Sequence, residues 1–359
     1  MSWILAFAGF AILVILHELG HFAVAKWVGM RVEKFSLFFP PTVLSKKVGE
    51  TEYALGSIPL GGYVRISGMN PSEDLPEEVR DRAYHAAPVW KRIAVIAAGP
   101  AVNLILAFAL LLVFFFLIGS PTATDRVDDV EKGYPAASAL KPGDRLLSVD
   151  GVRGTATELS RQIGRHKCVQ SPPTDGCRAG RPATLVLARD GRRVTERLAP
   201  IYDARNERTR LGFSYARGPR ETLPLSESFT TSAESFWIVT RETLKLPATL
   251  IDGEKRKEIS GVVGTYETTR QVALIDVARV VQILAIISLS LAIINLFPFL
   301  PLDGGHIFWA IVEKVRGRPV PFAVMERAGV IGFMLVIGLF AIGLTNDIGR
   351  LQGEGFGIP

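Results

Sequence analysis

Three ionisable residues, His17, Glu18 and His21, lie within five positions of an otherwise apolar segment that begins near Trp3. On a helix, residues i and i+4 share a face, so the two imidazoles can bind one metal ion. Glu18 can then reach a water molecule on that ion, which is the arrangement of the HExxH zinc motif. The alternative is a chance match in a core helix of a soluble protein. Because ionisable side chains at membrane depth are costly, a functional metal site is favoured.

A third ligand is expected from the distant segment NLFPFLPLDGGH, residues 295 to 306, which contains Asp303. Its prolines and glycines interrupt an apolar stretch. A broken helix at membrane depth is tolerated where its backbone faces protein or a water-filled cavity. Alone, Asp303 could equally be a solvated cap at a helix end. With HExxH on another span, we expect Asp303 to be a metal ligand.

These residue types permit hydrolysis. Three protein ligands leave the fourth position of a tetrahedral Zn²⁺ open to water, whose pKa can fall to about 7. Glu18 would take a proton from that water and pass it to the leaving amine. Asn295 could donate a hydrogen bond to the developing oxyanion, or instead join two helices.

The elements that must position these residues are membrane-spanning helices. Hydrophobic residues make up 48% of the chain and charged residues 21%, and the mean hydropathy is +0.27. Four apolar stretches predict spans: Trp3 to Trp27, Ile93 to Ile118, Val277 to Leu300, and Ala328 to Leu344. The first lacks a basic leader and a small-residue cleavage site, so we expect it to be retained.

Lysine and arginine beside the spans predict their orientation. The loop from Lys26 to Arg92 holds ten basic residues, and basic residues also follow the third span from Lys314 to Arg327. Both loops should face the cytoplasm, with residues 120 to 276 outside. The net charge of +6 is thus attributed to topology, and no nucleic acid is expected as a partner.

Between the first two spans, alternating apolar residues in TEYALGSIPLGGYVRISGM, residues 51 to 69, predict a β-hairpin containing the pair Gly61 and Gly62. Further on, Cys168 and Cys177 occupy one Pro-rich loop of the outer region. The outer location is oxidising, which favours a disulfide between the two cysteines. The spacing between them does not fit a CxxC-type metal site. Residues 225 to 250 suit an amphipathic helix at the outer membrane surface.

The chain resembles the bacterial site-2 proteases, which are intramembrane zinc metalloproteases. The matching motifs are HELGH at His17 to His21, GPAVN at Gly99 to Asn103 opening the second span, and the segment from Asn295 to Gly305 that ends in LDGG. The resemblance implies that His17, His21 and Asp303 bind zinc, with Glu18 as catalytic base. It also places Asn295 near the substrate backbone or oxyanion.

One departure from the family pattern concerns the prolines before Asp303. Pro298 is followed by Pro301, whereas the family usually places its second proline two residues after the first. The spacing from Asn295 to Asp303 is kept.

The resemblance further implies the substrate class. Such enzymes cleave single-span membrane proteins within the bacterial inner membrane, after another protease has removed the outer domain; an anti-sigma factor or a signal-peptide remnant is the expected substrate. The active site would lie toward the cytoplasmic side of the bilayer. An unwound substrate strand would pair with the hairpin edge at Gly61, Gly62 and Tyr63.

The outer region contains AASALKPGDRLLSVDG, residues 136 to 151, which resembles the turn and strand of a PDZ domain. One such domain is expected. In site-2 proteases the PDZ domain is circularly permuted, so the carboxylate-binding segment would be Leu211, Gly212 and Phe213. The domain could bind peptide C-termini or act only as a steric filter. Ile259 to Gly264 resembles the family's re-entrant segment before the third span.

The expected fold is therefore a multi-span α-helical membrane protein of about four transmembrane helices. It carries a cytoplasmic, membrane-associated β-hairpin and one inserted extracytoplasmic PDZ domain of the α+β class. The predicted parts are residues 1–119 and 277–359 for the two halves of the protease core, 122–216 for the PDZ domain and 217–276 for the membrane-surface segment. Two alternative classes are a silent membrane scaffold with structural zinc, in which Glu18 has no role, and a metal transporter, which would need more than one ligand cluster.

Overall fold

A computed structural model describes residues 2–70, 73–204, 208–253 and 255–353. The chain forms two compact units. The first, here called the membrane unit, comprises residues 1–117 and 223–359, and the second, called the β unit, comprises Ile118–Thr222. Each unit is described by itself.

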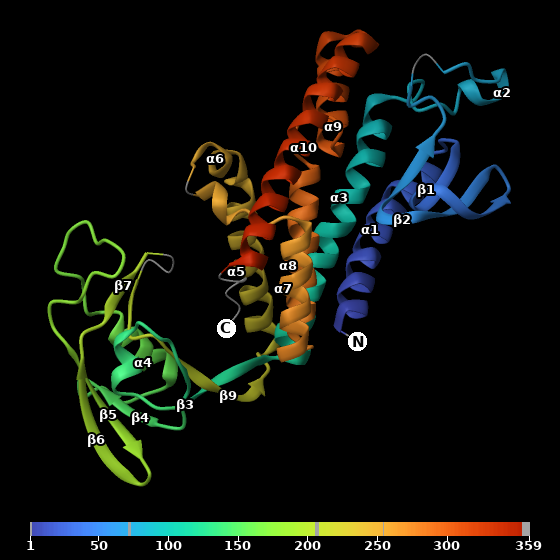
Figure 1. Ribbon diagram of the computed structural model, residues 1–359. Coiled ribbons are helices and arrows are strands. Elements are labelled where there is room, and N and C mark those ends of the chain that lie inside the picture. Colours follow the sequence, from blue (N-terminus) through green and yellow to red (C-terminus); the bar gives the residue numbers. More distant parts are fainter. Residues whose placement is uncertain (1, 71–72, 205–207, 254, 354–359) are drawn as a thin grey trace. The chain divides into compact units, whose positions relative to one another are not determined.

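Helices dominate the membrane unit (Figure 1). Helix α3 (Val89–Val113) packs between α1 (Ser2–Trp27) and α8 (Arg279–Asn295). The remaining helical elements are α2 (Glu77–Arg80), a π-helical turn (Phe114–Ile118), α5 (Leu225–Leu244), α6 (Leu246–Ile251), a 3₁₀ turn (Lys255–Glu258), α7 (Val262–Ile275), α9 (Asp303–Arg316) and α10 (Phe322–Gln352).

Three helices in the described part of the chain are long and apolar enough to cross a membrane. They are Phe7–Trp27, Val89–Ile118 and Ala323–Gln352. The third predicted span, Val277 to Leu300, is helical only over the 17 residues of α8. Its helix stops at Asn295 because Pro298 and Pro301, which follow, cannot continue the hydrogen-bond ladder. The last helix is longer than its apolar stretch predicts.

Helix α7 begins in the segment predicted to be re-entrant. The buried carboxylate of Asp347, in α10, accepts hydrogen bonds from the backbone N–H of Gly261 (3.0 Å) and of Gly264 (2.7 Å). It thereby satisfies amides that the first turn of α7 leaves free. A side chain of one helix thus caps another.

Helix α5 forms within the predicted amphipathic segment, and part of its apolar side packs on other helices. Phe229 and Phe236 contact the ring of Phe108 in α3, with centroids 5.2 and 6.1 Å apart. Phe236 also packs on the buried cluster that α3 and α8 share. Burial against protein therefore accounts for part of the apolar surface that the sequence assigns to lipid.

The sheet of the membrane unit consists of β1 (Val32–Val48) and β2 (Thr51–Ile66), which pair antiparallel. Residues 32–37 lie between residues 51–55 and residues 62–66, because Ser36 opposes both Ala54 and Tyr63. Residues 42–48 pair with the other side of residues 51–56. The sheet thus has four segments in the order 62–66, 32–37, 51–56, 42–48. The hairpin was predicted around Gly61 and Gly62, but the turn that joins β1 and β2 lies at Gly49, and β1 was not predicted.

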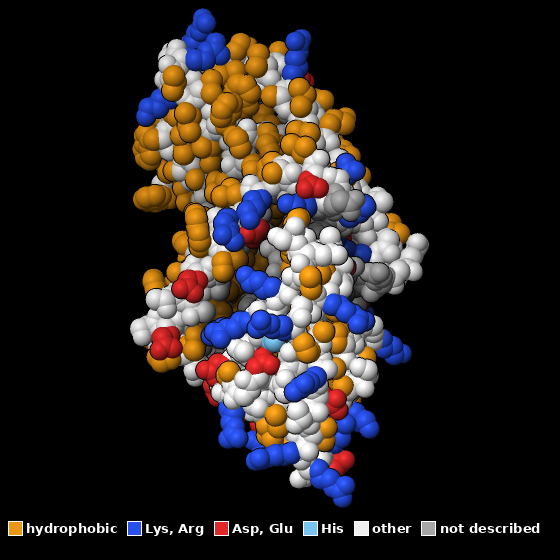
Figure 2. Space-filling model, turned by 90° about the vertical axis from the view of Figure 1, so that its left-hand side faces the viewer, with side chains coloured by type: hydrophobic (Ala, Val, Ile, Leu, Met, Phe, Trp, Pro, Cys, Tyr) orange, Lys and Arg blue, Asp and Glu red, His pale blue; other side chains and the backbone are white. Residues whose placement is uncertain are grey.

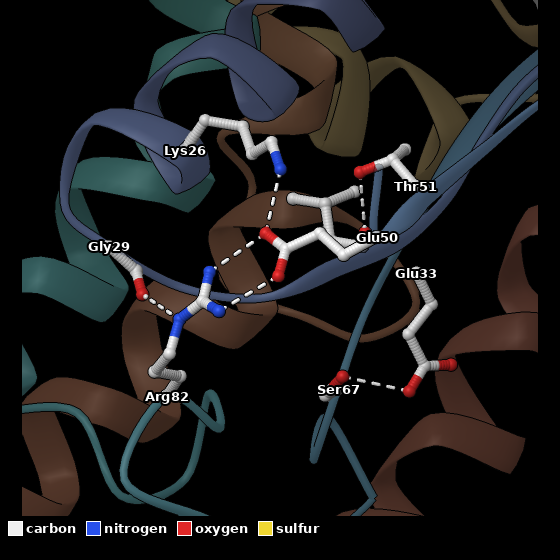
Figure 3. Close-up of polar contacts among 8 residues, drawn as sticks. Lys26, Gly29, Glu33, Glu50, Thr51, Ser67 and Arg82 are labelled. Carbon is white, nitrogen blue, oxygen red and sulfur yellow. Dashed lines mark hydrogen bonds and ion pairs between the residues drawn. The ribbon is translucent and has the colours of Figure 1, made fainter. Parts of the chain in front are cut away.

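Glu50, beside that turn, ties the sheet to the end of α1 (Figure 3). Its carboxylate accepts hydrogen bonds from Arg82 and Lys26, each at 2.8 Å. These bonds, chiefly those from Arg82, lower the pKa of Glu50 to about 2. In the same region Thr51 donates to the carbonyl of Val32, and Ser67 donates to Glu33. The position of the sheet against α1 is therefore fixed by polar contacts as well as by packing.

The β unit is built on a five-stranded antiparallel sheet in the order β6-β5-β4-β3-β9. Its apolar core includes Leu146, Leu185 and Leu187 from the strands and Leu159 and Ile163 from α4 (Ala156–Ile163). Thr155 and Glu158 form a capping box at the start of α4. The strands are β3 (Ser120–Val130), β4 (Arg145–Val149), β5 (Ala183–Arg189), β6 (Arg192–Leu198) and β9 (Phe213–Glu221), with β7 (Ile201–Asp203) and β8 (Arg208–Arg210) as a separate pair and a 3₁₀ turn at Pro135–Ser138.

The β unit contains the Pro-rich cysteine loop and extends beyond the predicted domain at both ends. Cys168 and Cys177 are joined by a disulfide. Strand β9 continues to Glu221, so the compact unit runs from Ile118 to Thr222 rather than from 122 to 216. The residues after it, predicted as a separate membrane-surface segment, pack as α5 and α7 with the other helices of the membrane unit.

Candidate metal centre

Helices α1 and α9 bring three potential ligands together. Nε2 of His17 and Nε2 of His21 lie 3.2 Å apart, because the two residues are one helical turn apart on α1. Oδ2 of Asp303, the first residue of α9, lies 3.2 Å from Nε2 of His17 and 3.4 Å from Nε2 of His21. The three atoms therefore form a nearly equilateral triangle.

This triangle has the size that tetrahedral zinc requires. Zn–N distances of 2.0–2.1 Å at a tetrahedral angle place neighbouring ligand atoms about 3.3 Å apart. Oδ2 of Asp303 is also buried without a hydrogen-bond donor among the described residues. A buried carboxylate oxygen without a donor is costly unless a cation binds it, so the cluster fits a metal ion.

Helix α3 orients His21. Nδ1 of His21 lies 2.8 Å from the backbone oxygen of Val95, which can only accept. Nδ1 must therefore carry the proton, and the lone pair of Nε2 is free for a metal. Gly99 lets α3 come this close, because a Cβ there would lie 2.2 Å from Nε2 of His21.

One turn further along α3, Asn103 contacts the other imidazole. Its fully buried side-chain amide lies 3.2 Å from Nδ1 of His17. If Nε2 of His17 binds a metal, Nδ1 carries a proton, and the amide then turns its oxygen toward it. The hydroxyl of Ser288 in α8 donates to the backbone oxygen of Asn103 (2.9 Å). Asn103 thus links α3 to both α1 and α8.

The ligand cluster opens into a cavity of 410 Å³ within the membrane unit. Glu18, Asn295 and His306 line it together with residues of β2, including Gly61, Gly62 and Tyr63. Gly62 lies directly against Glu18, since a Cβ there would be 3.0 Å from Cγ of Glu18 and 2.8 Å from the carbonyl oxygen of Ser36. A carboxylate, a metal cluster and the edge of a sheet therefore meet in one space.

The structure brings together most, not all, of the residues singled out from the sequence. His17, Glu18, His21, Asn295 and Asp303 line one cavity, as do the three hairpin residues. Leu211, Gly212 and Phe213 instead lie in the β unit, before and at the start of β9. There Gly212 adopts a φ of +78° and packs against Tyr134.

Three residues of the site have roles that the sequence analysis missed. They are Gly99 and Asn103, whose position near the ligands was not foreseen, and His306, one turn after Asp303 on α9. The GPAVN motif contains the first two, but it was expected to open the second span. It lies instead ten residues inside α3, facing α1.

Known proteins share this sequence over nearly its whole length. The model of peptidase family M50 matches residues 5–339. A Brucella suis protein named "putative zinc metalloprotease" is 33% identical, over 94% of this chain and 92% of its own length. Proteins of the same name from Agrobacterium fabrum and Nostoc sp. are each 31% identical, over 96% and 99% of this chain and 94% and 98% of their own lengths.

The family match and the relatives' names agree with the geometry of the site. The cluster of two histidines and one aspartate explains why a metal is needed, and the apolar helices explain why the family match indicates an integral membrane protein. The chain belongs to peptidase family M50 and is a zinc metalloprotease.

Proposed function

We propose that this metalloprotease cleaves single-span membrane proteins at a site within the bilayer. The observation that carries the proposal is the shared cavity: the two histidines of the cluster sit on an apolar helix of membrane-spanning length, and the cluster lies beside the edge segment 62–66 of a sheet. A transmembrane helix must unwind before its backbone can reach a metal. A free sheet edge can hold the unwound strand by main-chain hydrogen bonds.

His17, His21 and Asp303 hold the zinc ion in this mechanism. When bound, zinc supplies Lewis-acid chemistry, which makes water nucleophilic near neutral pH and polarises the scissile carbonyl. Glu18 accepts a proton from the attacking water as the new C–O bond forms. It then gives the proton to the departing amine as the C–N bond breaks. Asn295 donates a hydrogen bond toward the carbonyl oxygen as negative charge develops there.

Gly61, Gly62 and Tyr63 position the substrate strand. Within the described sheet, segment 62–66 pairs only with 32–37, so its other side is available to a further strand. The absence of a side chain at Gly62 keeps this strand close to Glu18. The scissile bond of a paired strand would then lie near the base.

The proposed location is the inner membrane of a bacterium, with the active site toward the cytoplasm. The basic residues from Lys26 to Arg92 support a cytoplasmic sheet, and the disulfide of Cys168 and Cys177 supports an oxidising location for the β unit. The β unit is proposed to be a PDZ domain, in which Leu211, Gly212 and Phe213 bind a peptide C-terminus or the fold screens substrates by size. Thiol labelling of Ser45→Cys and Thr174→Cys tests sidedness: opposite sides are expected, and the same side for both contradicts the topology.

Purified protein in lipid vesicles with a panel of single-span peptides tests the activity. Glu18→Gln should lose cleavage while retaining one zinc per chain, and Asp303→Ala should lose both. Cleavage by the wild type should stop with a chelator and return with zinc. Full cleavage by Glu18→Gln would remove Glu18 as base. Cleavage of water-soluble peptides alone would remove the membrane substrate, and no cleavage at all would favour the scaffold alternative.

A further inference from the structure

The net positive charge of the chain resides in the β unit. Residues 118–222 contain 19 lysines and arginines and 13 aspartates and glutamates, a net charge of +6, whereas the membrane unit contains 22 of each class. The sequence analysis attributed the net charge to topology, but the loops that predict topology lie in the membrane unit, whose charges sum to zero. In Figure 2, the lower part of the visible face belongs to the β unit and shows many more basic than acidic side chains.

Arginines of the β unit line up in one row across its sheet. Arg193 in β6 opposes Ala188 in β5, Ala188 opposes Arg145 in β4, and Arg145 opposes Arg126 in β3. Residues directly opposite in a sheet share a face, so the three arginines point to the same side. Arg197 lies four residues after Arg193 on the same strand and has the same direction. These four residues are called the arginine face.

The arginine face is the solvent side of the sheet. Its strand neighbours Val127 and Leu146 point the other way and belong to the buried core, on which α4 packs. All four arginines are exposed. Arg145 is paired with Asp125 at 2.5 Å, whereas Arg126, Arg193 and Arg197 have no carboxylate partner in the part of the chain that the structure describes.

Like charges directly opposite in a sheet destabilise it. Neighbouring strands are about 4.8 Å apart, so Arg126 and Arg145 are held close together. Charges on an edge strand can serve to prevent aggregation, which would explain Arg193 and Arg197 on β6. That explanation does not reach Arg126 and Arg145, because β3 and β4 are interior strands. Since Asp125 pairs with Arg145, Arg126 is the interior arginine of the row that calls for a further anionic partner.

We propose that the arginine face binds the anionic phospholipid headgroups of the membrane that the helices cross. The chain passes from the turn Phe114–Ile118 into β3 at Ser120, and from β9 at Glu221 into α5 at Leu225. Because the two links between the β unit and the membrane helices are only a few residues long, the effective concentration of lipid headgroups at the β unit is high. Guanidinium groups bind phosphate through two parallel hydrogen bonds, and arginine outnumbers lysine 16 to 3 in this unit.

A peptide partner fits this surface less well. Extended peptides are recognised at sheet edges or in grooves, where the backbone is accessible. The arginine face spans four strands of a sheet, three of them without a free edge. It presents several separated positive charges in one plane, which complements a plane of phosphates.

Fluorescence quenching of the full-length protein in vesicles tests the proposal. Thr195 is exposed between Arg193 and Arg197, and Thr195→Cys would carry the dye, because the native cysteines are joined to each other. Vesicles would contain phosphatidylglycerol and a lipid with a quencher on its headgroup. We expect strong quenching that falls at least fivefold in neutral phosphatidylcholine vesicles and in 1 M salt, where the Debye length is about 3 Å.

Two controls make the test specific to this face. A dye at Thr157→Cys, exposed on α4 and thus on the other side of the sheet, should show little quenching. Changing Arg126, Arg145, Arg193 and Arg197 together to Gln should reduce quenching at Thr195 as much as neutral lipid does. The matched variant changes Arg153, Arg161, Arg165 and Arg181 to Gln; it removes the same charge outside the arginine face and should retain quenching.

Several results would overturn the proposal. Equal quenching at Thr157 and Thr195, or equal loss in the two charge variants, would show non-specific attraction of the whole unit. Unquenched dye at Thr195 in anionic vesicles would exclude lipid. If the fluorescence of the dye at Thr195 instead changed when poly-glutamate was added to protein in neutral vesicles, the partner would be an acidic protein segment. The double variant Arg193→Gln with Arg197→Gln changes only the edge strand β6 and should reduce quenching at Thr195 by an intermediate amount. It keeps the proposal testable if the fourfold variant misfolds.

Discussion

The fully buried side chain of Asn103 lies 3.2 Å from Nδ1 of His17, on the side of the imidazole away from the other two ligand atoms. Nε2 of the same ring is the atom that faces His21 and Asp303. A hydrogen bond at Nδ1 fixes the tautomer and the direction of the ring, and hence where the lone pair of Nε2 points. Asn103 is therefore placed to orient the proposed zinc ligand His17 without touching the metal.

Replacing Asn103 by Leu should weaken zinc binding by about 10- to 100-fold, the usual effect of losing such a partner. Asn103→Asp should largely restore it, because a carboxylate accepts the same hydrogen bond from the imidazole. Competition with a fluorescent chelator measures the affinity directly. Ser288→Ala is the matched control, since the hydroxyl of Ser288 donates to the backbone oxygen of Asn103 rather than to its side chain. Unchanged affinity in Asn103→Leu would show that the contact is merely packing.

Gly62→Ala should impair cleavage and spare the metal. The new Cβ would meet the backbone oxygen of Ser36 at 2.8 Å and Cγ of Glu18 at 3.0 Å, so the strand must move away from the base. A displacement of about 1 Å can cost about 100-fold in rate. We expect that order of loss in kcat with one zinc per chain. Gly338→Ala, where a Cβ meets nothing within 4 Å, should retain full activity, and equal loss in both variants would contradict the argument.

The cluster of two histidines and one aspartate could be predicted from the sequence because its residue types and spacing are local. His17 and His21 need only a helix to share a face, and Asp303 stands out at a break in an apolar stretch. Asn103 could not be assigned in the same way, since its role depends on which side of α3 faces α1. Spacing within one helix does not reveal that contact.

The same distinction applies to the fold. The apolar stretches predicted helices close to α1, α3 and α10, because length and hydropathy are properties of one segment. The pair Gly61 and Gly62 predicted a hairpin region, but these glycines serve close approach to Phe39, Ser36 and Glu18 rather than the turn. A pair of glycines can serve either a tight turn or a close approach of the backbone to other atoms. Only the residues that lie nearby in the folded structure show which of the two applies. β1 was missed because Pro40 and Pro41 lie in its middle and lysines lie near its end, a composition that favours a loop.

Arg92 and Glu313 form a largely buried pair that joins α3 to α9, with the two guanidinium nitrogens 2.9 and 2.6 Å from the carboxylate oxygens. Arg92→Met would leave Glu313 unpaired and should lower stability by about 3 kcal/mol. The double variant Arg92→Met with Glu313→Leu should recover much of this loss. Unfolding of the wild type and the two variants in detergent measures these differences in stability. Because α9 begins at Asp303, the single variant should also bind zinc more weakly, and a single variant as stable as the wild type would contradict the role of the pair.

Glu50 should make stability depend on pH in the acid range. Bonds from Arg82 and Lys26 lower its pKa to about 2, below an unfolded value of about 4.3. A lowered folded pKa means that the contribution is complete above the unfolded pKa and is lost as pH falls through about 2. The difference in unfolding free energy between wild type and Glu50→Gln should therefore be constant above about pH 5 and shrink toward pH 2. Thermal unfolding across this range measures it, with Glu78→Gln, in the same loop, as control. A difference that does not change between pH 7 and pH 2 would show that Glu50 acts by packing rather than by its charge.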